Sequence, residues 1–247
     1  MQGWILWQGS NLEAGINMVK SVLVVVAHPD DEVLGCGGTI ARHVWNGDQV
    51  NVVILAEGLT SRMNGPSNVA ELADLHRAAH RANEVLGVSS LVIDGLPDNR
   101  LDSIDRIEVT QRIEAHIKRC RPSIVYTHHV GDVNIDHQVT HHATVTACRP
   151  QPGHPVDTLL FFEVASSTEW QPPGSGVPFQ PNWFVSVTKT LHLKLSALEQ
   201  YQSEMRPWPH PRSLKAVEHL ARWRGTTVGI EAAEAFVLGR RCTGINE

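Results

Sequence analysis

The chain is short of paired cysteines, of positive charge and of long apolar runs, and each shortage excludes a class of protein. Its four cysteines lie far apart, so we expect reduced structural thiols and no disulfide framework. No apolar run approaches the roughly 20 residues that a membrane-spanning helix needs. The net charge is −5 and the pI is about 6.3, so no basic surface for nucleic acid or anionic lipid is expected.

The first 17 residues are expected to be an extension, and residues 18–247 a single domain. The stretch Trp4–Trp7 is apolar, but no basic residue precedes it and polar residues from Gln8 onward interrupt it. This is a poor signal peptide, so the cytoplasm is the expected location.

Short apolar runs rich in β-branched residues alternate with segments of helical length. The apolar runs predict strands at Val22–Val26, Val50–Leu55, Leu91–Ile93, Ile124–Thr127, Thr158–Phe162 and Trp183–Val187. The intervening segments predict helices at Thr39–Trp45, Val69–Leu86, Ile104–Cys120, Leu191–Met205 and from about Ser213. This alternation predicts an α/β fold with a Rossmann-like, mainly parallel sheet and helices on both faces.

A polar cluster follows the first predicted strand directly. Residues 27–32 (AHPDDE) bring one imidazole and three carboxylates to the carboxyl end of Val22–Val26, where open α/β sheets bind their ligands. His28 and Asp31 lie three residues apart and can converge on one point if a helix begins there. Imidazole and carboxylate together suit Zn²⁺, and also Fe²⁺, Co²⁺ or Mn²⁺.

A second polar cluster, residues 128–137 (HHVGDVNIDH), follows the predicted strand Ile124–Thr127. The carboxyl ends of parallel strands meet at one edge of a sheet, so the two clusters are expected to lie together. The second cluster is therefore the expected source of a third metal ligand.

The two clusters resemble the motifs of the PIG-L/LmbE-like family of metal-dependent N-deacetylases. AHPDDE at residues 27–32 is followed by Gly-x-Gly-Gly-Thr at residues 35–39, and DVNIDH at residues 132–137 is similar to the family's second motif. Leu96–Leu101 and Gly229–Phe236 resemble further segments of the family. The resemblance covers most of the chain in looser form and agrees with the α/β fold expected from the strand pattern.

This resemblance implies roles for individual residues. The implied metal ligands are His28, Asp31 and His137. Asp30 would be the general base that accepts a proton from the attacking water. The implied reaction releases acetate from an N-acetylated amino sugar, such as N-acetylglucosamine or a conjugate of it, with Zn²⁺ or another divalent ion as cofactor. The expected binding partner is then a small N-acetylated sugar or a conjugate of one. Assembly into a homo-oligomer is an open alternative to a monomer.

One position departs from the family pattern. Many members have a histidine three residues before the third ligand, where this chain has Asn134. An amide can donate a hydrogen bond to an oxyanion but cannot release a proton, so the group that protonates the leaving amine stays unassigned. Asp136 is expected to orient a ligand. Candidate substrate contacts from loops at the same edge are Arg62, Asp98, Asn99, His129 and His210.

Other functions are weaker or stay open. The glycines after the first cluster do not have the G-x-G-x-x-G spacing of a dinucleotide site, and the acidic residues beside them would repel a pyrophosphate. His137 and His141 form H-x-x-x-H, but Gln138 replaces the glutamate that a zinc protease needs. Two alternatives stay open: an amidase for a larger acyl group or a thiol conjugate, and a non-catalytic sugar- or metal-binding protein on the same scaffold.

Overall fold

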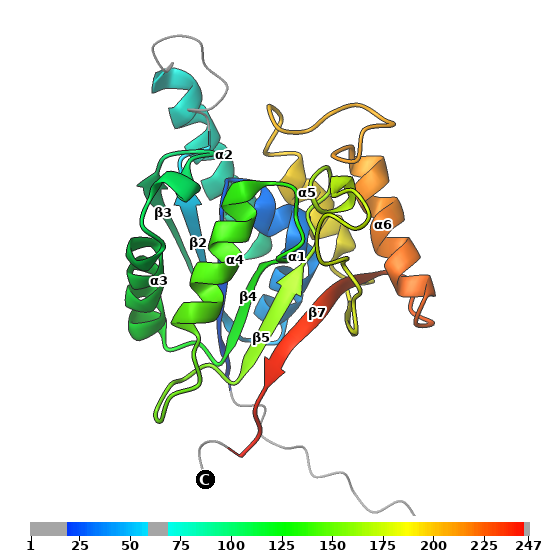
Figure 1. Cartoon of the computed structure of the whole chain (residues 1–247). Helices are drawn as coiled ribbons and strands as arrows, with labels where there is room; N and C mark the ends of the chain where they lie inside the picture. The colour runs from blue at the N-terminus through cyan, green and yellow to red at the C-terminus, as the bar shows by residue number, and fades with distance from the viewer. Residues whose placement is uncertain (1–18, 59–68, 245–247) are drawn as a thin grey trace, which may run out of the picture.

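A seven-stranded sheet with helices on both faces runs through the part of the chain that the computed structural model describes, residues 19–58 and 69–244 (Figure 1). The strands are β1 (Ser21–Val26), β2 (Gln49–Ala56), β3 (Ser90–Leu96), β4 (Ile124–His128), β5 (Thr158–Phe162), β6 (Trp183–Ser186) and β7 (Ala233–Arg241). The helices are α1 (Asp31–Trp45), α2 (Val69–Leu86), α3 (Arg106–Cys120), α4 (Ile135–Ala147), α5 (Leu191–Leu198) and α6 (Leu214–Thr226), with short 3₁₀ helices at Leu101–Ser103 and Thr168–Trp170. The predicted extension at residues 1–17 and the candidate contact Arg62 lie outside the described residues.

The order of the strands places a ligand site at one point of the sheet edge. The order is β3-β2-β1-β4-β5-β7-β6, in which the first five strands are parallel and β7 is antiparallel to both of its neighbours. The chain first builds outward from β1 to β2 and β3, and then returns to β4 on the other side of β1. This reversal makes the carboxyl ends of β1 and β4 the switch point at which open α/β sheets bind ligands.

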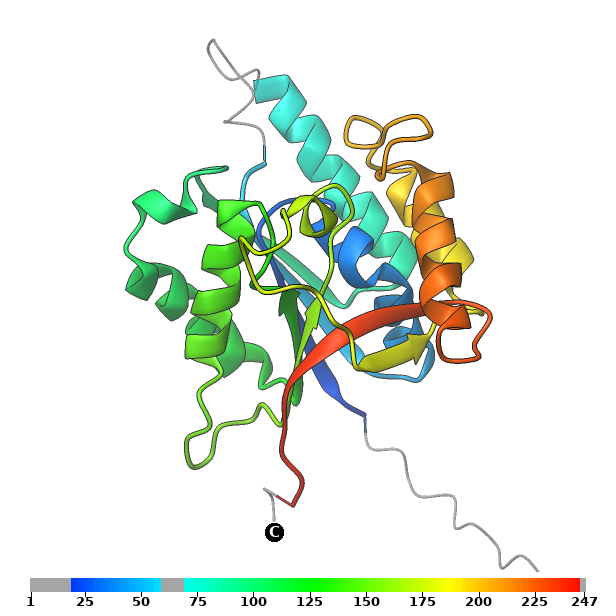
Figure 2. The same cartoon turned by 45° about the vertical axis from the view of Figure 1, so that its right-hand side comes forward.

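The two faces of β1 belong to two different hydrophobic layers. Val22, Val24 and Val26 pack with apolar residues of α1, α2 and α5 on one face. Leu23 and Val25 pack with residues of α3 and α4 on the other. Figure 2 shows these two helical layers with the sheet between them. A strand that is buried on both faces is apolar throughout, as the run Val22–Val26 had indicated.

Helix α1 begins at Asp31, eight residues before the predicted start at Thr39. Its glycines are part of the helix: a Cβ at Gly35 would lie 2.3 Å from the ring of Phe162 on β5, so a glycine permits the close approach of helix and sheet. The helix is broken at Cys36, with φ −148° and ψ 25°. This early start places Asp31 in the first turn, directly above the carboxyl end of β1.

A buried ion pair stabilises the broken helix. The Glu234 carboxylate accepts hydrogen bonds from the backbone N–H groups of Gly38 (3.0 Å) and Thr39 (2.7 Å), which lie just after the break. Lys194 donates to Glu234 at 2.6 Å and to the Leu34 carbonyl at 2.8 Å. Both charged side chains are buried, so each depends on the other.

Replacing Glu234 by Gln is expected to lower the free energy of unfolding by about 3–5 kcal/mol, because Lys194 would keep a buried charge without its counter-ion. Urea unfolding followed by circular dichroism measures the change. The double variant Glu234→Gln/Lys194→Met removes both charges and should recover part of the loss. A single variant that unfolds like the wild type would contradict this role for the pair.

Besides α1, three elements differ from the sequence-based prediction. Strand β7 was not predicted; it inserts between β5 and β6 as an antiparallel strand. Helix α5 ends at Leu198, seven residues before the predicted end at Met205. Helix α4, which follows the second polar cluster, was expected only as a segment of helical length around His141 and His142, without bounds. Among the described residues, no helix has the length and apolar character needed to cross a membrane.

Candidate metal centre

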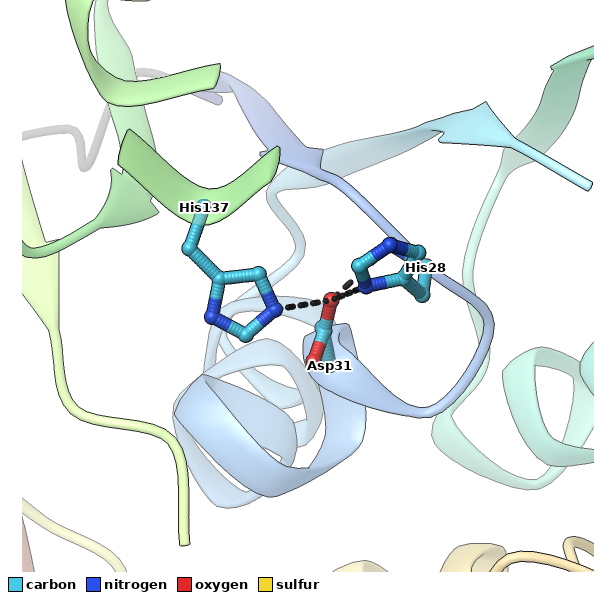
Figure 3. Close-up of side chains that lie close together, drawn as sticks. All are labelled: His28, Asp31 and His137. Carbon is cyan, nitrogen blue, oxygen red and sulfur yellow. Dashed lines mark hydrogen bonds and ion pairs between the residues drawn. The ribbon is translucent and has the colours of Figure 1, made fainter. Parts of the chain in front are cut away.

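Three predicted ligands converge above the carboxyl ends of β1 and β4 (Figure 3). Asp31 Oδ2 lies 3.3 Å from His28 Nδ1 and 3.2 Å from His137 Nε2. His28 follows β1, Asp31 opens α1, and His137 lies in the first turn of α4. The reversal of the sheet order therefore brings together two clusters that are more than a hundred residues apart in the chain.

Each histidine is held from behind by a buried carboxylate. His28 Nε2 lies 3.0 Å from Asp136 Oδ2 and 3.2 Å from Asp98 Oδ1. His137 Nδ1 lies 3.1 Å from Asp132 Oδ2. Because an ionised carboxylate can only accept, each imidazole donates its N–H backwards and turns its other nitrogen toward Asp31.

Negative charge dominates the interior of the site. The buried carboxylates near the cluster are Asp30, Asp31, Glu32, Asp98, Asp132 and Asp136. Burial alone would lower the pKa of His28, but Asp136 and Asp31 raise it to about 10. Burial also opposes protonation of His137, and Asp31 and Asp132 raise its pKa to about 9. The carboxylates thus stabilise positive charge at this point, which either protons on the histidines or a divalent cation can supply.

The donor set fits a divalent cation. One ligand atom each from His28, Asp31 and His137 lies within 4.8 Å of the others. Asp31 Oδ1 is buried and has no hydrogen-bond partner, and His137 Nε2 has none either. Two imidazoles and one carboxylate are a set that catalytic Zn²⁺ sites use and that Fe²⁺, Co²⁺ and Mn²⁺ also accept.

Asp30, the predicted base, lies beside the ligand set and has a different partner. Its Oδ2 accepts a hydrogen bond of 2.7 Å from Arg212 Nη1. Its backbone is left-handed, with φ 102°, and its N–H donates to Glu32 Oε2 at 3.1 Å. Burial raises the pKa of the Asp30 carboxyl to about 8, and Arg212 opposes that shift. A strained backbone at a buried carboxylate is typical of a functional position.

Glu32 stabilises the turn that contains Asp30 through buried hydrogen bonds. Its Oε1 accepts hydrogen bonds from Tyr201 (2.6 Å) and from Asn83 (2.9 Å), and its Oε2 receives the Asp30 N–H. Burial raises the pKa of Glu32 to about 7, although Tyr201 and Asn83 stabilise the ionised form. The last acidic residue of the AHPDDE motif thus helps to hold Asp30 in its left-handed conformation.

Asn134 and its neighbours form a chain of amide and carboxylate contacts. Asn134 Oδ1 caps α4 by accepting the Asp136 N–H at 2.8 Å, and its Nδ2 donates to Asn99 Oδ1 at 3.2 Å. Asn99 in turn donates to Asp98, which is buried against His28. Asp136 also accepts the Leu101 N–H at 2.9 Å. Asp98, predicted to contact substrate, therefore lies behind a predicted metal ligand, and the Asn134 oxygen is used as a helix cap.

The other histidines near the site have partners within the protein. His129 Nε2 donates to the Val177 carbonyl at 3.0 Å and so holds residues 171–181, a loop rich in Pro and Gly, at this edge of the sheet. His210 Nδ1 accepts the Arg212 N–H at 3.0 Å. His128 Nε2 accepts the Ala27 N–H at 2.9 Å, which occupies the nitrogen nearest the site. The structure thus gives His129 and His210 loop contacts, and their predicted contact with substrate stays a prediction.

Two residues of the site make contacts that the sequence did not predict. Asp132 was given no role, and Arg212 was expected, with His210, only as a residue that could close over a substrate. The Asp132 carboxylate contacts His137 Nδ1, and the position of Asp132 in the DVNIDH motif did not indicate this contact. Arg212 pairs with Asp30 across 182 positions of the chain. Arg212 directly follows residues 207–211 (PWPHP), and no spacing rule connects such a proline-rich tract to the first strand. The only indication of the contact between Arg212 and Asp30 in the sequence was a basic residue expected at the same sheet edge as an acidic motif.

Known proteins resemble this chain over the region that contains both polar clusters. The family model for GlcNAc-PI de-N-acetylase (PIG-L) matches residues 23–148, which include both polar clusters. The uncharacterized deacetylase YaiS of Escherichia coli K12 is 28% identical over 78% of this chain and 97% of its own length. Diacetylchitobiose deacetylase of Thermococcus kodakarensis is 28% identical over 76% of this chain and 71% of its own length.

Solved structures share the fold. N,N'-diacetylchitobiose deacetylase from Pyrococcus horikoshii superposes with a TM-score of 0.73 at 20% identity, covering 93% of this chain and 87% of the other. GalB, the 4-carboxy-2-hydroxymuconate hydratase from Pseudomonas putida KT2440, gives a TM-score of 0.73 at 21% identity, covering 91% and 98%. The same fold thus occurs with different activities, and the residues of the site must decide between them.

Proposed function

Because the chain belongs to the GlcNAc-PI de-N-acetylase (PIG-L) family of deacetylases, we propose that it is a divalent-metal-dependent hydrolase that removes the acetyl group from an N-acetylated amino sugar or a conjugate of one. The observation that carries the proposal is the convergence of His28 Nδ1, Asp31 Oδ2 and His137 Nε2 next to the separate carboxylate of Asp30. Zn²⁺ is the proposed ion, with Fe²⁺, Co²⁺ and Mn²⁺ as the other candidates.

The proposed reaction adds water to the amide carbonyl, breaks the C–N bond, and releases acetate and a free amine. His28, Asp31 and His137 would hold the ion, which when bound supplies a Lewis acid that increases the acidity of water and stabilises negative charge on the carbonyl oxygen. Asp30 would accept the proton that the attacking water loses. A base with a pKa near the working pH transfers protons efficiently, and burial moves the Asp30 pKa toward that range.

Arg212 orients the proposed base. Its Nη1 donates to Asp30, and its Nε donates to Ser166 Oγ at 2.8 Å, so the guanidinium is fixed at two points. The same Asp30 carboxyl can return the proton to the departing nitrogen, so the reaction needs no second titratable acid at Asn134. Asn134 is then a structural cap of α4 in this chain.

The substrate class is tested with a panel of N-acylated amino sugars, in which released acid and free amine are both measured. We expect acetate and amine in equal amounts from N-acetylated sugars or their conjugates, and slower release from analogues with longer acyl chains. Faster release of a longer acyl group would favour the related amidase. Binding of sugars without any release, by protein that contains the metal, would favour a non-catalytic scaffold.

A further inference from the structure

The carboxylate of Asp132 accepts several hydrogen bonds in the interior of the protein. The side chain is fully buried in the loop between β4 and α4. Its Oδ1 accepts the Asn134 N–H at 2.9 Å and the Ser167 hydroxyl, and its Oδ2 accepts the Thr168 hydroxyl at 2.7 Å. The same Oδ2 lies 3.1 Å from His137 Nδ1. Every neighbour of this carboxylate is therefore a donor.

This arrangement determines which nitrogen of His137 carries the proton. A neutral imidazole has one N–H and one nitrogen lone pair, and the partner of one nitrogen selects the state of the other. A carboxylate at Nδ1 requires the proton there. The lone pair is then on Nε2, which lies 3.2 Å from Asp31 Oδ2 and has no hydrogen-bond partner.

We propose that Asp132 is a positioning residue for metal binding, which holds His137 in the Nδ1–H tautomer and in the orientation that presents Nε2 to the ion. The inference rests on the proposed function, because it needs a metal at His28, Asp31 and His137. Asp132 touches neither the predicted ion nor the substrate, and it acts only through His137. A carboxylate behind a ligating histidine also increases the basicity of the ligand.

The segment after β5 fixes Asp132 in turn. Ser167 and Thr168 hold the two carboxylate oxygens, and the Thr168 hydroxyl accepts the Val164 N–H at 2.8 Å. Ser166, next in the same segment, contacts Arg212. The predicted ligand His137 and the predicted base Asp30 are thus positioned from one segment, residues 164–168. The alternative is that Asp132 only anchors this segment and has no influence on the metal.

The variant Asp132→Asn separates the two roles. The backbone N–H of Asn134 can only donate, so the new amide must keep its oxygen there and turn its NH₂ toward His137. His137 Nδ1 would then have to accept, and its proton would move to Nε2, the nitrogen that should bind the ion. We expect a metal affinity about 10–100-fold weaker than that of the wild type. Competition with a chromogenic chelator measures the affinity, and the absorption spectrum of the Co²⁺-loaded protein should also change.

Ser167→Ala is the matched control. It removes one hydroxyl from the same carboxylate, together with a longer 3.5 Å contact between Ser167 Oγ and His137 Nδ1, but leaves the 3.1 Å contact between Asp132 and His137. Metal affinity should therefore change much less than in Asp132→Asn. If Asp132→Asn does not fold, Asp132→Glu keeps the charge in a shifted position and should also bind metal more weakly. Wild-type affinity and an unchanged Co²⁺ spectrum in the folded variant would overturn the inference. A wild type that binds no metal would instead refute the proposed function.

Discussion

Replacing Asp30 by Asn is expected to lower kcat by about 10²–10⁴-fold while the protein keeps its metal, because a positioned general base typically contributes that factor. The expectation depends on the separation of Asp30 from the ligand set. Its carboxylate pairs with Arg212 at 2.7 Å, whereas Asp31 is the carboxylate that faces both histidines. Asn has nearly the same size, and its oxygen can still accept the hydrogen bond from Arg212.

The measurement compares steady-state acetate release with metal content determined by elemental analysis on the same preparation. Thermal unfolding checks that the variant is folded. Loss of the metal together with activity would show that Asp30 is a ligand, and the assignment of a separate base would be wrong. Activity near that of the wild type would show that another group accepts the proton.

The variant His137→Ala is expected to lose both metal and activity. Two of the three ligand atoms would remain. Loss of a residue that only orients a ligand typically weakens metal affinity roughly 10–100-fold, and loss of a ligand itself should weaken it further. Without the ion, no group in the described site replaces its Lewis acidity, so acetate release should fall below detection. Metal per chain and acetate release are measured after dialysis against metal-free buffer.

His141→Ala is the matched control on the same helix. His141 lies one turn further along α4, and its Nδ1 donates to the carbonyl of His128 at 2.9 Å, away from the cluster. This variant should keep its metal and its kcat, although it can be less stable. If His137→Ala binds metal as tightly as the control, the proposed ligand set is wrong.

Local sequence patterns predicted the central strands well, because their apolar runs are short and are bounded by turns. The β1 and β4 runs, each followed by a polar cluster, also led to the correct expectation that the two clusters lie together. That expectation needs only parallel strands in one sheet, which the alternation of strands and helices indicates. The choice of His28, Asp31 and His137 within the clusters came from the family resemblance. The roles of these three residues in metal binding stay predictions.

Features set by distant contacts could not be predicted in the same way. Helix α1 includes Gly35 because the Phe162 ring lies against it, and no local pattern contains that contact. Strand β7 pairs with β5 and β6, which precede it by many residues, and its sequence AEAFVLGRR has no regular alternation of apolar and polar residues that would indicate a strand. The contacts of Arg212 with Asp30 and of Asp132 with Ser167 likewise depend on loops that meet only in the folded chain.

The central claim is that this chain hydrolyses an N-acetyl group with a metal held by His28, Asp31 and His137. The most direct test measures metal content and acetate release on the same protein before chelation, after chelation and after reloading with Zn²⁺ or Fe²⁺. We predict about one divalent ion per chain, acetate release from at least one N-acetylated sugar, loss of release after chelation and recovery after reloading. Acetate release at the same rate from the metal-free protein would contradict the account.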